Sequence, residues 1–151
     1  MTDVMTKVQR SALMSRVLGR GNRSTELKML GLMRASAIKG WRRHLDLPGR
    51  PDFAFPNMQL AIFVDGCFWH GCPRCYQSPK SNALYWKRRI HENKARDRRV
   101  GRLLRKEGWQ VLRIWECDLA KRSEWISSRL SLEISGLRDG VRIAASGHRV
   151  R

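Results

Sequence analysis

Apolar residues along the chain gather in short runs and in helical stripes, and together they predict an α/β fold: a small mixed sheet flanked by helices. Runs over residues 52–55 and 60–64 predict two strands joined by a turn at 56–57. A third strand is predicted within "GWQVLRIWE", residues 108–116, after a long helical segment at 82–106. Because a strand reached through a helix usually runs parallel to the strand before it, we expect the second and third strands to be parallel.

The first predicted helix covers residues 24–37, and its opening serine and threonine can cap it. Leu30, Met33 and Ala37 would form its inward face, and Glu26 lies on that face one turn before Leu30. An acid on an inward stripe is a candidate site residue. The alternative is that Glu26 only complements the helix dipole.

A last helix is expected to begin near Asp118, with Ile126, Leu130 and Ile134 facing inward. Residues 24–136 would then form one domain of sufficient size to bury a core. Residues 1–23 hold five basic residues against one acid, which predicts a basic arm that orders on its partner. Residues 137–151, rich in arginine and glycine, are expected to form a flexible basic tail.

The charge of the chain points to a polyanionic partner. The formal net charge is +18 over 151 residues, and the sequence pI is about 11.3. Lysine and arginine neutralise phosphates and release counterions, so nucleic acid is the natural partner, and a merely soluble basic surface is the alternative. A membrane surface would also attract this charge, but no stretch approaches the roughly 20 apolar residues of a membrane span. The N-terminus lacks the apolar segment of a secretory signal, so we expect a cytoplasmic protein.

The four cysteines have metal-ligand spacing. Cys67, Cys72 and Cys75 form C-x4-C-x2-C, and Cys117 follows the third predicted strand. Four thiolates suit a closed, structural zinc site that clamps the loop after the second strand to the end of the third. Unrelated buried thiols or an iron–sulfur cluster are alternatives, as is a ligand role for His70. No other feature of the sequence obviously orders this loop.

Two acids predict a second, harder metal site. Asp52 begins one predicted strand and Asp65 ends the next, so both can converge on Mg2+, which prefers carboxylate oxygens and water. The pattern is similar to the metal-binding signature of restriction-type nucleases, but Cys67 stands where that signature has a lysine. His70 is the candidate for activating the attacking water, because histidine titrates near neutral pH.

The long predicted helix carries polar residues on its apolar face. The stripe with helical spacing contains Trp86, Ile90, Asn93, Asp97, Val100 and Leu104. Buried polar groups need partners, so the amide and the carboxylate in this stripe should point at the region of His70 and Asp65. The alternative is that the helix rolls and both are solvated. Half of the residues from 87 to 106 are basic, which predicts a phosphate-contacting surface. Candidates for these contacts are Lys87, Arg88, Arg96, Arg98 and Arg99.

At this point several stretches together resemble the very short patch repair (Vsr) DNA mismatch endonucleases: "LPGRPDFAF", "AIFVDGCFWHGC", "SPKSN…YW", "ENKARDRR" and "GWQVLRIWECDL". The resemblance runs from about residue 11 to 119. It implies a restriction-endonuclease-like core, and hydrolytic nicking of duplex DNA 5′ of the thymine in a T·G mismatch left by deamination of 5-methylcytosine. It also implies two catalytic Mg2+ ions and one structural Zn2+.

The resemblance implies roles for particular residues. Asp52 and the backbone carbonyl of Val64 would bind Mg2+, and His70 would be the general base. The supporting site residues would be Glu26, Asp65, Asn93 and Asp97. The zinc ligands would be Cys67, Cys72, Cys75 and Cys117. The side chains inserted into the base stack would be Phe68, Trp69 and Trp86, for which core packing is the alternative.

The chain departs from the best-known form of the family in two places. That form has one histidine among its zinc ligands, and it has threonine and histidine where Val64 and Asp65 stand. The role of Asp65, as ligand or as a supporting residue, is therefore left open. We expect a monomer that acts at the nucleoid, and we leave open whether it contacts mismatch-repair proteins. A non-catalytic zinc-stabilised protein for distorted duplex, and a related restriction-type nuclease that cuts matched DNA, are the alternative functions.

Overall fold

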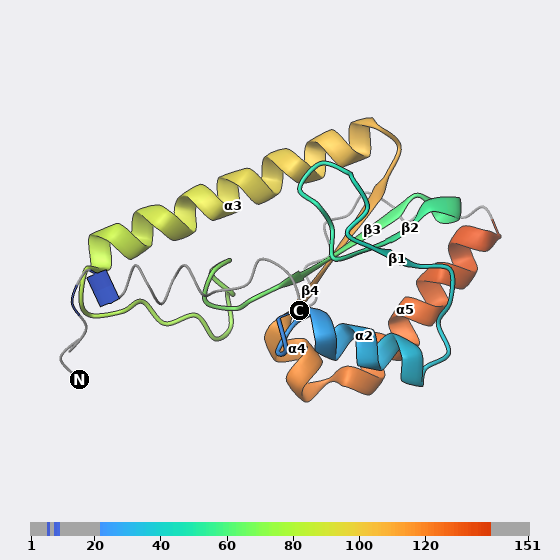
Figure 1. The fold of residues 1–151 in the computed structure, drawn as a ribbon, viewed down its shortest axis with the longest axis horizontal. Helices are drawn as coiled ribbons and strands as arrows, with labels where there is room; N and C mark the ends of the chain where they lie inside the picture. The colour runs from blue at the N-terminus through green and yellow to red at the C-terminus, as the bar shows by residue number, and fades with distance from the viewer. Residues whose placement is uncertain (1–5, 7, 10–21, 140–151) are drawn as a thin grey trace.

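The computed structural model describes residues 6, 8–9 and 22–139 (Figure 1). The predicted arm at 1–23 and the predicted tail at 137–151 therefore lie almost entirely outside the described residues. Within the described part of the chain, no helix is long and apolar enough to cross a membrane.

A mixed four-stranded sheet forms the centre of the structure, with strand order β1-β2-β3-β4. Its strands are β1 (Arg42–Arg43), β2 (Phe53–Phe55), β3 (Leu60–Asp65) and β4 (Gln110–Trp115). β1 pairs with β2 and β2 with β3 antiparallel, whereas β3 pairs with β4 in parallel, Val64 opposite Ile114. The predicted parallel pair is confirmed, while the short edge strand β1 was not predicted.

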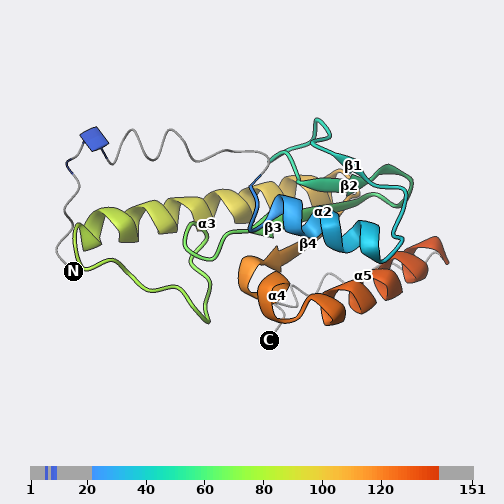
Figure 2. The same cartoon turned by 60° about the horizontal axis from the view of Figure 1, so that its bottom comes forward.

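Helices cover both faces of this sheet (Figures 1 and 2). Of the described helices, the long one lies on one face, and its N-terminal half extends past the end of the sheet. Helices from both ends of the described chain lie on the other face. The helical elements are α2 (Glu26–Ala35), η1 (Pro56–Met58), α3 (Ala83–Lys106), α4 (Glu116–Lys121) and α5 (Ser123–Arg138).

The pleat of β3 divides the core between these faces. All six residues of β3 are buried, as expected for a continuous apolar run at the centre of a sheet. Leu60, Ile62 and Val64 pack with side chains of α2 and α5, whereas Ala61 and Phe63 pack with Leu104 of α3. Because side chains alternate along a strand, Asp65 belongs to the same face as Phe63, the face covered by α3.

Three predictions about the helices are wrong in detail. Ala37 is exposed with φ +53°, because α2 ends at Ala35, and Ile38 takes the buried position instead. Thr25 is the N-cap residue, yet no side chain caps the helix by a hydrogen bond. The predicted last helix is two helices, α4 and α5, interrupted at Arg122. The inward positions in α5 are confirmed, since Ile126, Leu130 and Ile134 are buried.

Candidate active site and metal centre

The four cysteines meet in one cluster at the end of β3 and the start of α4. Their Sγ atoms all lie within 4.8 Å of one another, and the Sγ atoms of Cys72 and Cys117 are 3.8 Å apart. Four sulfurs around one zinc at the usual Zn–S length would be about 3.8 Å apart. The donor set and its spacing therefore fit a tetrahedral thiolate site.

The surroundings of the cluster lower the pKa of one thiol, Cys72, and raise the pKa of two others, Cys67 and Cys75. Burial raises the pKa of Cys72, but hydrogen bonds from the backbone N–H groups of Arg74 and Cys75 and from neighbouring thiols lower it to about 7. Burial holds the pKa of Cys67 above its ordinary value, so this thiol stays protonated until a cation offsets the cost of its charge. Arg74 also donates to Sγ of Cys117 at 3.6 Å and to Asp118 at 2.6 Å. A guanidinium thus lies beside the ligand set and offsets part of its negative charge.

The loop after β3, residues 66–76, is ordered by more than the cysteines, contrary to our expectation. The backbone N–H of Cys67 donates to Glu116 at 3.1 Å, and the amide of Asn93 donates to the carbonyl of Trp69 at 2.8 Å. Gly71 has φ +61°, and a Cβ there would lie 2.6 Å from Cγ2 of Ile90 on α3. Only glycine allows the loop to pack this closely on the helix.

The aromatic residues of the loop pack on one another and on α3. The ring of Phe68 lies 5.2 Å from Trp69 and 5.1 Å from Trp86, each in an edge-on arrangement. Trp86 is 7% exposed, so it forms the floor of this aromatic cluster, while Phe68 and Trp69 are partly exposed above it. Tyr85, which sequence reasoning missed, is 58% exposed and contacts Trp86.

Asp52 lies directly before β2, and its carboxylate reaches across to β3. Oδ2 accepts a hydrogen bond from the backbone N–H of Val64 at 2.7 Å. Burial raises the pKa of Asp52, the Val64 N–H lowers it, and the negative charges of Glu26 and Asp65 raise it further, so that its pKa lies above the ordinary value. An ionised Asp52 is therefore costly here, and a bound cation would offset that cost.

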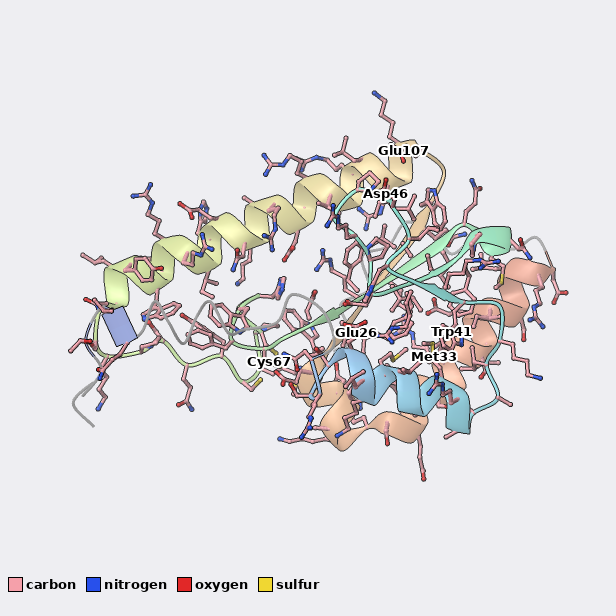
Figure 3. All side chains as sticks on the ribbon, in the orientation of Figure 1. Glu26, Met33, Trp41, Asp46, Cys67 and Glu107 are labelled. Atoms are coloured by element: carbon pink, nitrogen blue, oxygen red, sulfur yellow. The ribbon has the colours of Figure 1, made fainter. Side chains whose placement is uncertain are left out.

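Glu26 is a further acid at this end of the sheet, and unlike the half-buried Asp52 it is buried. Its side chain is 2% exposed, on the first turn of α2. Oε1 accepts hydrogen bonds from Nε of Arg43 at 3.1 Å and from its Nη2, and it also contacts Nε2 of His44. Figure 3 shows Glu26 and Cys67 toward the same end of the sheet.

Asp65, at the end of β3, is bound to an arginine of the neighbouring strand. Nη1 of Arg113 lies 2.7 Å from each carboxylate oxygen of Asp65. Nη2 of the same guanidinium lies 3.3 Å from Oδ1 of Asp97 on α3. Its carbon Cζ lies 4.6 Å from the ring centre of Phe63. Arg113 thus connects two acids on the face of the sheet covered by α3.

His70 faces both of these acids. Its Nδ1 lies 2.6 Å from Oδ2 of Asp97 and 3.9 Å from Oδ1 of Asp65. Burial raises the pKa of Asp97, but the hydrogen bond to His70 and the charge of Arg113 outweigh this and hold it below the ordinary value. Ionised Asp97 can only accept, so Nδ1 donates and the lone pair of a neutral ring lies on Nε2. The prediction that Asn93 and Asp97 point at the region of His70 is confirmed, since Asp97 contacts His70 and Asn93 contacts the carbonyl of Trp69, and the solvated alternative is wrong.

The outward side of α3 is strongly basic. All five predicted phosphate contacts are exposed, namely Lys87, Arg88, Arg96, Arg98 and Arg99. Arg88 is also paired with Glu92 at 3.0 Å. The helix therefore presents Asn93 and Asp97 inward, toward the loop, and these five cations outward.

Sequence reasoning missed the arginines and histidine that hold the acids. Arg113 could have been found, because a charged residue within the apolar run "VLRIW" needs a buried partner. Arg43 and His44 lie in a segment without periodicity, and nothing in the sequence pairs them with Glu26. The assembled arrangement offers buried carboxylates for a hard cation, an oriented histidine base, and an aromatic surface on one loop.

Comparisons with known proteins agree with this arrangement. The sequence model of the family described as DNA mismatch endonuclease Vsr matches residues 2–77, about half of the chain. The type II nicking enzyme V.XorIIP of Xanthomonas oryzae pv. oryzae is 40% identical over 122 residues, covering 80% of this chain and 88% of that protein. The type II nicking enzyme V.HpaIIP of Haemophilus parainfluenzae is 33% identical, covering 87% and 92%.

One relative aligns over almost the whole length of both chains. The DNA mismatch endonuclease Vsr of Escherichia coli is 33% identical over an alignment of 153 positions, covering 97% of each protein. The aligned region therefore spans the segments that carry the cysteine cluster, the acids and the helices α3 and α5. The chain belongs to the Vsr family of DNA mismatch endonucleases.

Proposed function

We propose that this protein nicks duplex DNA on the 5′ side of the thymine in a T·G mismatch that arises from deamination of 5-methylcytosine. The observation that carries the proposal is the loop at residues 66–76. It places Phe68 and Trp69 in an aromatic cluster and His70 against Asp97, so one rigid segment can contact the base stack and the backbone together. The family membership supports the reaction class, which is endonucleolytic cleavage of DNA. The specificity for a T·G mismatch rests on the resemblance to the Vsr endonucleases.

The residues present fit two kinds of metal. Asp52 and the backbone carbonyl of Val64 would hold Mg2+, and the raised pKa of Asp52 among other acids supports a cation there. Two bound Mg2+ ions would lower the pKa of water and stabilise charge on the phosphate oxygens. The four cysteines would hold one Zn2+ in a closed site that leaves no position for water, so its role would be structural.

The residues of the chain would guide proton transfer during hydrolysis. Asp97 fixes Nδ1 of His70, and Nε2 takes a proton from the attacking water. The water oxygen bonds to phosphorus as the bond to the leaving oxygen breaks, and that oxygen takes a proton from solvent. Asn93 supports this geometry through its hydrogen bond to the backbone carbonyl of Trp69, the residue before the general base His70.

Mismatch recognition would depend on the cost of opening the base stack. Unstacking a step costs a few kcal/mol, and least where pairing is already faulty. Phe68 and Trp69 are exposed enough to insert, with Trp86 beneath them. The five exposed basic residues of α3 would contact phosphates and contribute affinity without sequence selectivity.

The remaining parts of the proposal concern the whole protein. Its mixed sheet between helices is consistent with a restriction-endonuclease-like core. The basic segment at residues 1–23 would form an arm that reaches around the duplex. We propose that the protein acts as a monomer on chromosomal DNA in the nucleoid.

A nuclease that nicks matched DNA is the second candidate. The observation in its favour is that several relatives carry the name type II nicking enzyme, which mentions no mismatch. A protein that only binds distorted duplex is disfavoured. In such a protein the acids clustered at Asp52 would repel the DNA phosphates and would have no catalytic role.

One experiment separates these functions. Purified protein is incubated with Mg2+ and with matched or T·G duplexes of otherwise identical sequence, and both strands are resolved. We expect one nick, 5′ of the mismatched thymine, and none in matched DNA. Equal nicking of matched DNA would support the second candidate, and no nick on any duplex would rule out both.

The metal assignment is tested with two aspartate variants. Asp52→Ala should abolish nicking while mismatch binding persists, because the side chain contacts metal rather than DNA. Asp46→Ala removes an exposed acid and serves as the matched control with full activity. A fully active Asp52→Ala protein would contradict the assignment.

A further inference from the structure

We infer that Arg113 is a positioning residue of the active site: it holds Asp65 away from a ligand role and orients Asp97, which in turn fixes the tautomer of His70. The inference rests on the proposed function only in taking His70 as the base. It concerns a residue of β4 that contacts neither the phosphate nor a metal in the proposed mechanism.

The contacts of Asp65 argue against a ligand role. Its side chain is 5% exposed, and both of its oxygens lie 2.7 Å from the same nitrogen, Nη1 of Arg113. A carboxylate held in this way has its negative charge already offset. Asp52 differs, because only its Oδ2 has a hydrogen-bond partner among the described residues, the Val64 N–H. The structure thus separates two acids that the sequence placed together: Asp52 remains available to a cation, whereas Asp65 anchors an arginine.

The second terminal nitrogen of the Arg113 guanidinium contacts Asp97, the acid that orients His70. Nη2 of Arg113 lies 3.3 Å from Oδ1 of Asp97, whose Oδ2 lies 2.6 Å from Nδ1 of His70. One planar group therefore fixes both the position and the charge of the acid that orients the histidine. Without it, Asp97 would lose its contact with the guanidinium, and its position against Nδ1 of His70 would no longer be fixed.

The position of Arg113 itself is fixed by the sheet. Arg113 is opposite Phe63 in the parallel pair of β3 and β4, and its guanidinium lies over the Phe63 ring, 4.6 Å from the centroid. The side chain is 25% exposed, so it is partly removed from water. Lysine at this position could neutralise Asp65, but a single ammonium lacks the planar fork that bridges two acids.

Five variants test the inference, and one of them is Asp65→Asn alone. Arg113→Met leaves buried Asp65 without its partner and could fail to fold. Arg113→Met/Asp65→Asn removes both charges and keeps the fold testable, and Arg113→Lys keeps the charge alone. Arg129→Met is the matched control, because Arg129 also pairs with an acid, Glu133, and lies near a ring, Trp125, but on α5 away from the site.

The first readout needs neither DNA nor Mg2+. The 15N shifts of the His70 ring, assigned with His70→Gln and measured where the ring is neutral, report its tautomer. We expect one tautomer with protonated Nδ1 in the unsubstituted protein and in Arg129→Met. We expect a mixture of tautomers in the double variant and an intermediate result in Arg113→Lys. An unchanged tautomer in the folded double variant would overturn the inference, whatever the activity.

The second readout is single-turnover nicking beside mismatch binding. The double variant should nick about 10- to 100-fold more slowly, the usual effect of losing a group that orients a site residue, with its dissociation constant changed less than about threefold. The effects of Asp65→Asn and Arg113→Met should not multiply, because both residues act through one contact. Multiplicative losses would show that Asp65 acts independently and would overturn the inference. If the unsubstituted protein nicks nothing, the proposed function fails, while the tautomer still decides this inference.

Discussion

The cysteine cluster and the acid–histidine site share one loop but are built in different ways. Three of the four thiols come from residues 67–75, and the fourth, Cys117, lies in the first turn of α4. The acid–histidine site instead collects residues from α2, the segment before β2, β3, the loop, α3 and β4. One site is therefore almost local in sequence, whereas the other exists only when the whole sheet and both helix layers are in place.

The two sites also differ in how their charges are balanced. The thiols have a donor set that one cation completes, and Arg74 lies beside them. At the other site Asp65 and Asp97 have Arg113, and Glu26 has Arg43, but Asp52 has a raised pKa among acids. If the proposed metal sites are right, the cysteine cluster would serve stability, whereas the acid–histidine site would hold the charge of Asp52 at the cost of stability.

The largest expected effect is at the cysteine cluster. Cys117→Ser should lose the metal and lower the free energy of unfolding on the order of 5 kcal/mol, because metal binding contributes directly to folding. Elemental analysis and urea denaturation measure the two quantities. Unsubstituted protein should hold about one zinc per chain.

A control for that experiment is His70→Ala. It should keep its zinc, since the four sulfurs already complete the ligand set. If His70→Ala lost the metal, or Cys117→Ser retained it, the division between the two sites would be wrong.

The next effect is on chemistry alone. His70→Ala should reduce the nicking rate about 10³-fold, the usual contribution of a general base, while the free energy of unfolding changes little. His91→Ala, an exposed histidine on α3, is the matched control with normal activity. A large loss of stability in His70→Ala would mean that the loop depends on this side chain for its fold.

The cysteine cluster was predictable from the sequence, because three of its cysteines are closely spaced along the chain. Cys67, Cys72 and Cys75 lie within one short loop, so their convergence needs no knowledge of the fold. The inward stripe of α3 was predictable as well, because helical periodicity places Asn93 and Asp97 on the face of Trp86 and Ile90.

The acid–histidine site was only partly predictable from the sequence. Asp52, Asp65 and His70 were named from the sequence, but the cations that balance the acids were not. Arg113 pairs with Asp65 only through the register of β3 and β4, and Arg43 meets Glu26 only because a short edge strand forms beside β2. Register and edge pairing are tertiary features, so local patterns do not specify them.

A smaller effect, on the free energy of unfolding, is expected when the charge of Asp52 is removed. Asp52→Asn should raise the free energy of unfolding at pH 7 by about 1 kcal/mol while abolishing nicking, because it removes a half-buried charge and keeps an acceptor for the Val64 N–H. The folded-state pKa of Asp52 lies above the ordinary 3.8, so the gain should be absent below that pH and appear as the pH rises through the folded-state pKa. Urea denaturation at pH 3 and pH 7 without Mg2+ measures it. A variant that is less stable at pH 7 would indicate that Asp52 is balanced in the free protein.

The smallest effect has the opposite sign and comes from the acid beside His70. The folded-state pKa of Asp97 lies below 3.8, so its charge stabilises the fold above that pH, and the contribution is lost as the pH falls through the folded-state pKa. Asp97→Asn should therefore cost about 0.5 kcal/mol at pH 7, a small value because the group is partly exposed and screened, and the cost should shrink as the pH falls below 3.8. Asp46→Asn, an exposed acid, is the control and should show neither change. Opposite pH dependences for Asp52→Asn and Asp97→Asn would show that one site contains both a charge held against stability and a charge that supports it. The same sign for both would mean that the acids titrate as one group, and that Arg113 does not separate them.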